Sequence, residues 1–308
     1  MGTLRFKCLK CKKTFTPRKK IKSSRYFSLF KTWISTSVTI ESLSKFRGSK
    51  VSPGTLRRHF DKFLDKSLKI KPLNKSKEIY LKVDGKYFGR WGCVLVFKEK
   101  QNIILWDFVQ RESYFGYLDN FSRLNKLGYK VFGITSDWHG SITSASKNRY
   151  PDVPHQRCLV HTQRFCQTYL TKHPETEAGI KLLEIVKFLN QVKNKSEKLI
   201  WTRWLQRFED KYKAQLNERS YAVDHKHWLY THKNLRRSFR ALKMSLSNLF
   251  LYLDYPQLCK DTNGLEAEFK HLKQKLAVHK GLTRKRKINF IKWYLYLKSK
   301  YYQKYHTF

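Results

Sequence analysis

The feature that most constrains the fold is the stretch Ile79–Gly89, which reads IYLKVDGKYFG. Its β-branched and aromatic residues favour a strand, yet one carboxylate, Asp84, stands at its centre. A carboxylate in the middle of such a strand is costly to bury unless something pairs with it, and a metal ion is one such partner. The sequence therefore predicts a strand that carries a functional acid.

Two more carboxylates stand at comparable places. The strand-like run Tyr129–Ser136 is followed by Asp137, and Glu266 lies at the start of a helix that Asn263 opens. Each acid also has an ordinary explanation. Asp84 and the glycine after it can form a hairpin turn, and Asp137 can cap a helix or belong to a loop. Glu266, three residues after Asn263, can complete a capping box.

The charge balance narrows the class of partner. The 308 residues include 65 Lys and Arg against 23 Asp and Glu, which gives a formal net charge of +42. A compact protein with this imbalance repels itself unless a polyanion is present, so DNA or RNA is the expected counter-surface, with salt-dependent binding. An anionic membrane is the rival partner, but no run approaches the roughly 18 apolar residues of a spanning helix. We expect no membrane association.

The N-terminus and the cysteines indicate the compartment. The Lys- and Arg-rich N-terminus lacks the apolar segment of a signal peptide. Six cysteines are sparse for this length and do not suggest a disulfide framework, so a reducing setting fits best. We expect a cytoplasmic, nucleoid-associated protein.

Three acids on a basic chain suggest chemistry on phosphodiesters. In-line attack on a phosphodiester needs an activated oxygen nucleophile and stabilisation of the leaving oxygen, and two Mg²⁺ ions about 3.5–4 Å apart supply both. Such hard ions take oxygen ligands from few carboxylates, waters and the substrate. Asp84, Asp137 and Glu266 would therefore serve as catalytic residues and as ligands of Mg²⁺ or Mn²⁺. In a chain with only 23 acids, their joint placement favours this interpretation over three separate structural roles.

The N-terminal arm, residues 1–27, carries Cys8 and Cys11 as a CxxC between aromatic residues. This is half of a zinc ribbon, and a complete Zn²⁺ site needs two more ligands. No second CxxC follows. The alternative is two reduced cysteines in a basic arm.

Residues 28–68 read as short helices. Ser52 is a good N-cap, and Pro53 at the first helical position opens a basic helix with an apolar stripe. A short helix, a tight turn and a basic second helix are typical of a helix-turn-helix. Arg57, Arg58 and Lys62 would then face DNA. The alternative is a small bundle that only packs.

After a polar linker, the pattern predicts three meandering strands, a helix and a fourth strand, which is the start of an RNase H-like α/β fold. That topology places the first strand beside the fourth and brings Asp84 and Asp137 together. A long helical and aromatic segment, too long for a loop, indicates an inserted unit. The expected divisions beyond the linker are the first part of the catalytic core at 78–165, a helical insertion at 166–258, and C-terminal helices completing the core at 259–308.

Cys158 and His161 form a CxxH motif after the second strand acid. The two residues can be a zinc pair, a nucleophile with its base, or a structural clamp. As a metal site the motif lacks two ligands, and as a catalytic pair it lacks a third partner. We therefore expect a structural role near the acids.

These motifs resemble those of DNA transposases of the Mutator-like superfamily and their bacterial insertion-sequence relatives, including a variant class with an N-terminal zinc-binding segment. The family has a first Asp within a short strand, a second Asp at a strand end, a Cys/Asp-x-x-His motif and an Asn-x-x-Glu that leads into basic segments. The matching segments here are KVDG at 82–85, ITSD at 134–137, RCLVH at 157–161, NGLE at 263–266, HLK at 271–273 and HKGL at 279–282.

The resemblance implies a DDE-type transposase of an insertion sequence that binds terminal inverted repeats through its N-terminal domain. It would hydrolyse the phosphodiester at an element end and direct the exposed 3′-hydroxyl onto another strand. Lys273 and Lys280 would contact DNA. A homodimer or a larger synaptic assembly on double-stranded DNA is expected. Trp201 or Trp204 would stack on a distorted DNA end, or simply belong to a core.

The chain departs from the family in its single CxxC, in Trp138-His139 after the second Asp, and in its length. A truncated or decayed copy is therefore one alternative. Another is a regulator or inactive remnant that binds DNA without catalysis. A nuclease that cuts without rejoining and a basic structural protein are further rivals, and the structural protein leaves the three acids unexplained.

Overall fold

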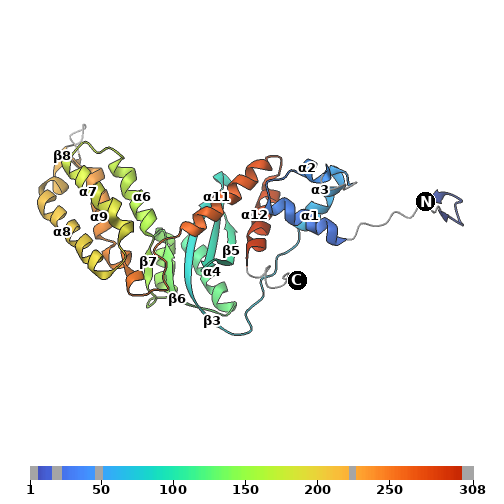
Figure 1. Ribbon diagram of the computed structural model, residues 1–308, viewed down its shortest axis with the longest axis horizontal. Coiled ribbons are helices and arrows are strands. Elements are labelled where there is room, and N and C mark those ends of the chain that lie inside the picture. The colour runs from blue at the N-terminus through green and yellow to red at the C-terminus, as the bar shows by residue number, and fades with distance from the viewer. Residues whose placement is uncertain (1–5, 16–22, 46–50, 222–226, 300–308) are drawn as a thin grey trace. The chain divides into compact units, whose positions relative to one another are not determined.

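A computed structural model describes residues 6–15, 23–45, 51–221 and 227–299 of the chain (Figure 1). The chain divides into two compact units. Unit 1 comprises Met1–Leu68 and Lys273–Leu297, and unit 2 comprises Lys69–Leu272 and Lys298–Phe308. None of the described helices is long and apolar enough to cross a membrane.

Unit 2 is a mixed α/β body around a five-stranded sheet. Its strand order is β5-β4-β3-β6-β7, in which β3, β4 and β5 form an antiparallel meander and β6 and β7 run parallel to β3. The first and fourth of these strands along the chain, β3 and β6, are therefore neighbours, as the sequence predicts. The strands span Lys77–Tyr87 (β3), Cys93–Glu99 (β4), Asn102–Val109 (β5), Tyr129–Ser136 (β6) and His155–Arg157 (β7).

The side chains of β3 alternate between buried and more exposed positions, as in a strand with one buried face. Ile79, Leu81 and Val83 are buried in one core with residues of helix α4, Tyr114–Lys126. Asp84, the next residue along, faces the other side because successive side chains alternate. Asp84 pairs with Val96 within the β3–β4 ladder, so it does not lie in a hairpin turn. The turn comes later, at a short 3₁₀ helix over Gly89–Trp91.

Helices follow the sheet strands. Helix α5 spans Gly140–Arg149 and α6 spans Leu159–Leu170. The expected helical insertion contains α7 (Glu177–Phe188), α8 (Lys195–Asn217), α9 (Lys233–Lys243), α10 (Leu246–Leu249), 3₁₀ turns at Leu189–Gln191 and Leu251–Leu253, and a hairpin of β8 (Arg219–Tyr221) and β9 (Trp228–Tyr230).

The insertion and α6 share a hydrophobic core of their own. Trp201 is 1% exposed and its indole donates to the Ile185 carbonyl oxygen at 2.9 Å, so it is a core residue. Trp204 is 38% exposed and makes an edge contact with Phe188. Of the two tryptophans considered for DNA stacking, only Trp204 is accessible.

Unit 1 contains helices from both ends of the chain. They are α1 (Ser23–Ser35), α2 (Ile40–Lys45), α3 (Pro53–Leu64), the last residues of α11 (Asn263–Val278) and nearly all of α12 (Arg284–Lys298). The same segments also include a small hairpin of β1 (Phe6–Lys7) and β2 (Thr14–Phe15). Ser52 caps α3 and Pro53 opens it, as predicted. Lys273–Leu297, expected among the helices that complete the catalytic core, instead belongs to one unit with the N-terminal helices.

Candidate active site

Two neighbouring strands and one helix present the three predicted acids. Lys82 of β3 is in register with Thr135 of β6, and Asp84 and Asp137 each lie two residues further on. Because the two strands are parallel, both acids come to the same edge of the sheet. Glu266 lies in the first turn of α11.

Asp84 is the most deeply buried of the three acids. Asp84 is 6% exposed, and burial raises its pKa to about 8. The negative charges of Asp137 and Glu266 contribute to that rise, whereas His161 opposes it. Within the described residues no side chain or backbone group donates a hydrogen bond to Asp84. A nearby cation would stabilise the ionised form of a buried carboxyl group that accepts no hydrogen bond.

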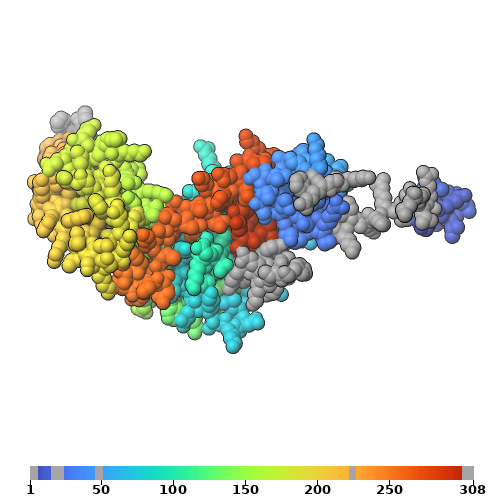
Figure 2. All heavy atoms as spheres, in the orientation of Figure 1, coloured from blue at the N-terminus to red at the C-terminus, as the bar shows by residue number. Residues whose placement is uncertain are grey.

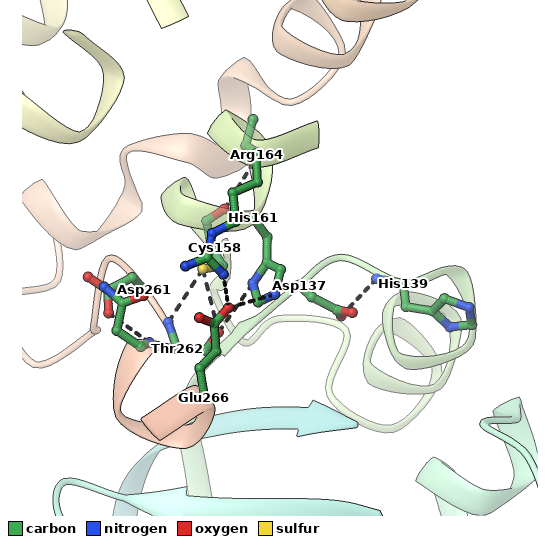
Figure 3. Close-up of polar contacts among 10 residues, drawn as sticks. Asp137, His139, Cys158, His161, Arg164, Asp261, Thr262 and Glu266 are labelled. Atoms are coloured by element: carbon green, nitrogen blue, oxygen red, sulfur yellow. Dashed lines mark hydrogen bonds and ion pairs between the residues drawn. The ribbon is translucent and has the colours of Figure 1, made fainter. Parts of the chain in front are cut away.

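Glu266 has partners on helix α6. Its Oε1 accepts a hydrogen bond from the guanidinium of Arg164 and lies 3.2 Å from Nε2 of His161 (Figure 3). Burial opposes ionisation of Glu266, but the hydrogen bond from Arg164 and the surrounding positive charge bring its pKa below the usual range. The carboxylate is therefore ionised and held toward α6.

Asp137 directly follows β6 and is half-buried. Its Oδ1 accepts a hydrogen bond from the backbone N–H of His139 at 3.0 Å (Figure 3). Trp138, between them, has a positive φ of 72°, which is uncommon for a residue with a side chain. The local turn thus fixes one carboxylate oxygen of Asp137.

The CxxH motif joins α6 to the segment before α11. Cys158 is buried, and its Sγ accepts hydrogen bonds from the backbone N–H and the hydroxyl of Thr262 at 3.4 and 3.5 Å. The same hydroxyl lies 3.3 Å from Nδ1 of His161, whose other ring nitrogen faces Glu266. Burial raises the pKa of the Cys158 thiol. A buried, protonated thiol of this kind suits a clamp better than a nucleophile.

Two further contacts position the start of α11 over the sheet. Thr135 of β6 donates its hydroxyl to the Cys259 carbonyl oxygen at 2.7 Å. The buried Lys98 of β4 donates to the Gly264 carbonyl oxygen at 3.4 Å. Residues far apart in sequence thereby fix where Glu266 stands.

The sequence analysis missed a fourth carboxylate, Glu112, which precedes α4. A Cβ at Gly85 would stand only 2.7 Å from Glu112 Oε1, so the glycine after Asp84 makes room for this side chain. Tyr117 donates a hydrogen bond to the carboxylate. Burial raises the pKa of Glu112, and the negative charge of Asp137 adds to the rise. The only sequence signal was an acid directly before a helix cap, which is usual in loops.

The donor atoms of these residues meet part of what a divalent ion requires. No three His, Cys, Asp or Glu side chains in the described part of the chain come together as a group that could hold a metal ion. Mg²⁺, however, is commonly held by one or two carboxylates with the rest supplied by water and substrate phosphate. Asp84 and Asp137 fit that requirement in donor type and position. Glu266 is engaged by Arg164 and His161 in this structure.

The predicted zinc residues lie in the β1–β2 hairpin. Two backbone hydrogen bonds close the turn. The Cys8 N–H donates to the Lys13 carbonyl oxygen, and the Lys12 N–H donates to the Cys8 carbonyl oxygen. Hydrogen bonds involving Cys11 and the neighbouring backbone lower the pKa of the Cys8 thiol. Both thiols are free, and the described residues add no third ligand.

The predicted DNA-binding residues all belong to unit 1 and are exposed. Arg57 forms an ion pair with Glu41 of α2, and Arg58 donates to the hydroxyl of Thr55 within its own helix. Lys62, Lys273 and Lys280 also lie at the surface.

Part of the chain resembles a known protein family. Residues 128–278 match the family model described as the transposase IS66 family. The match includes Asp137, the CxxH motif, the helical insertion and Glu266, and begins after Asp84. It supports a transposase of an insertion sequence, with DNA as the implied partner, and gives no support to the Mutator-like assignment or to its zinc-binding variant. No curated protein matches the chain.

Proposed function

We propose that this protein is a transposase that cuts and rejoins DNA at a divalent-metal site formed by Asp84, Asp137 and Glu266. The observation that carries the proposal is that the charges of Asp137 and Glu266 both act on the buried carboxyl group of Asp84, from segments up to 182 residues apart in sequence. The central mixed sheet, in which β3 and β6 are parallel neighbours, supports the proposal. Neither feature would be needed in a protein that only binds DNA.

The residues would act as follows. Asp84 and Asp137 would hold the ion from the sheet, and Glu266 would complete its ligands from α11. An ion held there would activate the attacking oxygen and stabilise the leaving oxygen. In hydrolysis a water oxygen bonds to phosphorus, and the bond from phosphorus to the 3′ oxygen breaks to leave a 3′-hydroxyl. In strand transfer that hydroxyl takes the place of water on a second phosphodiester.

The residues around the acids would support this chemistry. Cys158, His161 and Thr262 would keep α11 in place, and Arg164 would orient Glu266. The positive charge of the chain would bring two DNA ends to the protein, and pairing of the ends calls for at least two copies.

The experiment is a cleavage and strand-transfer assay on labelled duplex DNA from the ends of the element, with Mg²⁺, Mn²⁺ or EDTA. The native protein should give metal-dependent products, and Asp84→Asn should give none. The matched control is Asp107→Asn, since Asp107 is an acid of the same sheet paired with Arg123. Products from Asp84→Asn would refute the site.

One observation favours a second candidate, a DNA-binding regulator without catalysis. Glu266 is engaged by Arg164 and His161 instead of standing free beside Asp84. A regulator would bind the same DNA equally well with Asp84 or Asn at this position, and would release no product in any metal. The assay above separates the two functions.

A further inference from the structure

Unit 1 carries a disproportionate share of the positive charge. Its two segments contain 26 Lys and Arg against three acids, Glu41, Asp61 and Asp65. More than half of the formal net charge of +42 therefore belongs to this unit. Self-repulsion destabilises a unit with this charge imbalance, and a nearby polyanion relieves the repulsion.

The C-terminal helix α12 supplies part of the core of unit 1. The Trp293 indole donates a hydrogen bond to the Phe63 carbonyl oxygen at 2.9 Å, and its ring centroid is 5.1 Å from that of Phe30. Phe290 lies in edge contact with Trp33 at 5.2 Å. All of these side chains are buried. In Figure 2 the red C-terminal residues lie directly against the blue N-terminal helices. The N-terminal helices thus share one core with α12.

The acids of unit 1 hold its cations in place. Asp61 of α3 accepts a hydrogen bond from Arg286 of α12 at 2.6 Å, and Asp65, one turn further, lies 3.5 Å from Nζ of Lys285. Glu41 pairs with Arg57. All three acids therefore face cations of the same unit.

The first turn of α12 is unusual in its charge. It holds four successive cations, Arg284–Lys287, and no acid. Cations at a helix N-terminus oppose the helix dipole and cost stability unless anions are near. The carboxylates of α3 face two of these cations, Lys285 and Arg286. A DNA phosphate is a further anion that would stabilise this turn.

A shared hollow brings the two basic segments to one side of the unit. The cavity has a volume of about 400 Å³. It is lined by Arg57 and Asp61 of α3 and, from the other end of the chain, by Lys280, Gly281 and Arg286. Arg57 is engaged by Glu41, whereas its neighbours Arg58 and Lys62 are exposed on the same helix.

We propose that duplex DNA binds to a composite face made by α3 and by the segment that leads into α12. Arg58 and Lys62 of α3 and Lys280 and Lys285 of the second segment contact its phosphates. The carboxylates of Asp61 and Asp65 hold the basic first turn of α12 against α3. The identity of the ligand rests on the proposed function, but catalysis plays no part in this binding.

The test measures the affinity of the full chain for a fluorescent 30-bp duplex in EDTA across a range of salt concentrations. Lys280→Ala and Lys285→Ala should each weaken binding about tenfold at 0.1 M salt and lower the slope of log K against log salt by about one. Lys285→Arg and Lys280→Arg should bind like the native protein. Lys172→Ala, an exposed lysine of unit 2, is the matched control.

Folding is checked separately by thermal unfolding. Lys285 is 80% exposed, so its removal should leave the melting temperature unchanged. The proposal is overturned if both alanine variants keep the native affinity and slope while Arg58→Ala or Lys62→Ala binds more weakly. That result would mean that α12 only packs against α3 and does not contact DNA. Because EDTA prevents catalysis, this outcome is independent of whether Asp84→Asn abolishes cleavage.

Discussion

Asp84→Asn should stabilise the metal-free protein while abolishing its chemistry. In the folded state burial raises the pKa of Asp84 from 3.8 to about 8, a rise of about four pH units. An acid with a raised folded pKa binds its proton more tightly when folded, so stability falls as pH rises from about 4 to about 8. Each pH unit is worth about 1.4 kcal/mol, which makes the loss at pH 7 on the order of 4 kcal/mol.

An amide at position 84 removes this loss of folding stability because an amide does not ionise. The assay is urea unfolding in EDTA between pH 5 and pH 8.5. The midpoint of Asp84→Asn should exceed that of the native protein, by an amount that grows with pH up to about 8 and then levels off. Addition of Mg²⁺ should stabilise the native protein and leave the variant unchanged, since a ligand that binds only the folded state raises its stability.

Asp137→Asn is the matched control. Asp137 is half-buried and already accepts a hydrogen bond from His139 N–H, so its replacement should change the midpoint little. An Asp84→Asn variant that unfolds at the same or lower urea than the native protein at pH 8 would refute the account of Asp84 as an uncompensated buried acid.

Further predictions concern the neighbours of the acids. Arg164→Ala removes the hydrogen bond that favours ionised Glu266, so the pKa of Glu266 should rise toward its usual range, as a titration followed by NMR would show. Gly85→Ala should cost about 1–3 kcal/mol in urea unfolding because its methyl group meets the Glu112 carboxylate, and adding Glu112→Ala should restore most of the loss. Cys158→Ala removes the acceptor of both Thr262 hydrogen bonds and should cost about 1–3 kcal/mol in the same assay. Unchanged stability would argue against the clamp.

The sheet and the placement of the acids follow from local pattern. The alternation around Asp84, the strand Tyr129–Ser136 and the glycine-flanked meander are encoded over short stretches, so strand order could be inferred once the fourth strand was recognised. Asp84 was the most informative residue, because a carboxylate within a run of β-branched and aromatic residues has few ordinary explanations. The structure removes one of them, the hairpin turn, since the ladder continues through Asp84.

The rest depended on contacts between distant parts of the chain. Nothing near Glu112 indicates that its carboxylate fills the space left by Gly85, since the two residues are 27 positions apart. The partner of Glu266, Arg164, is likewise separated from it by 102 residues and sits among ordinary helix-forming neighbours. Pattern analysis finds the acids of such a site but not the groups that restrain them.

The position of α12 shows why the domain division could not be predicted. Its sequence mixes cations with aromatic residues and shows little amphipathic pattern, so it gives no sign of which surface it covers. The answer lies in α1 and α3, whose buried Phe30, Trp33 and Phe63 make a core that needs a fourth helix. A chain that loses α12 loses part of the core of unit 1, the unit to which we propose that duplex DNA binds. A fragment ending at Leu272 should therefore lose duplex binding even though every residue of α3 is present.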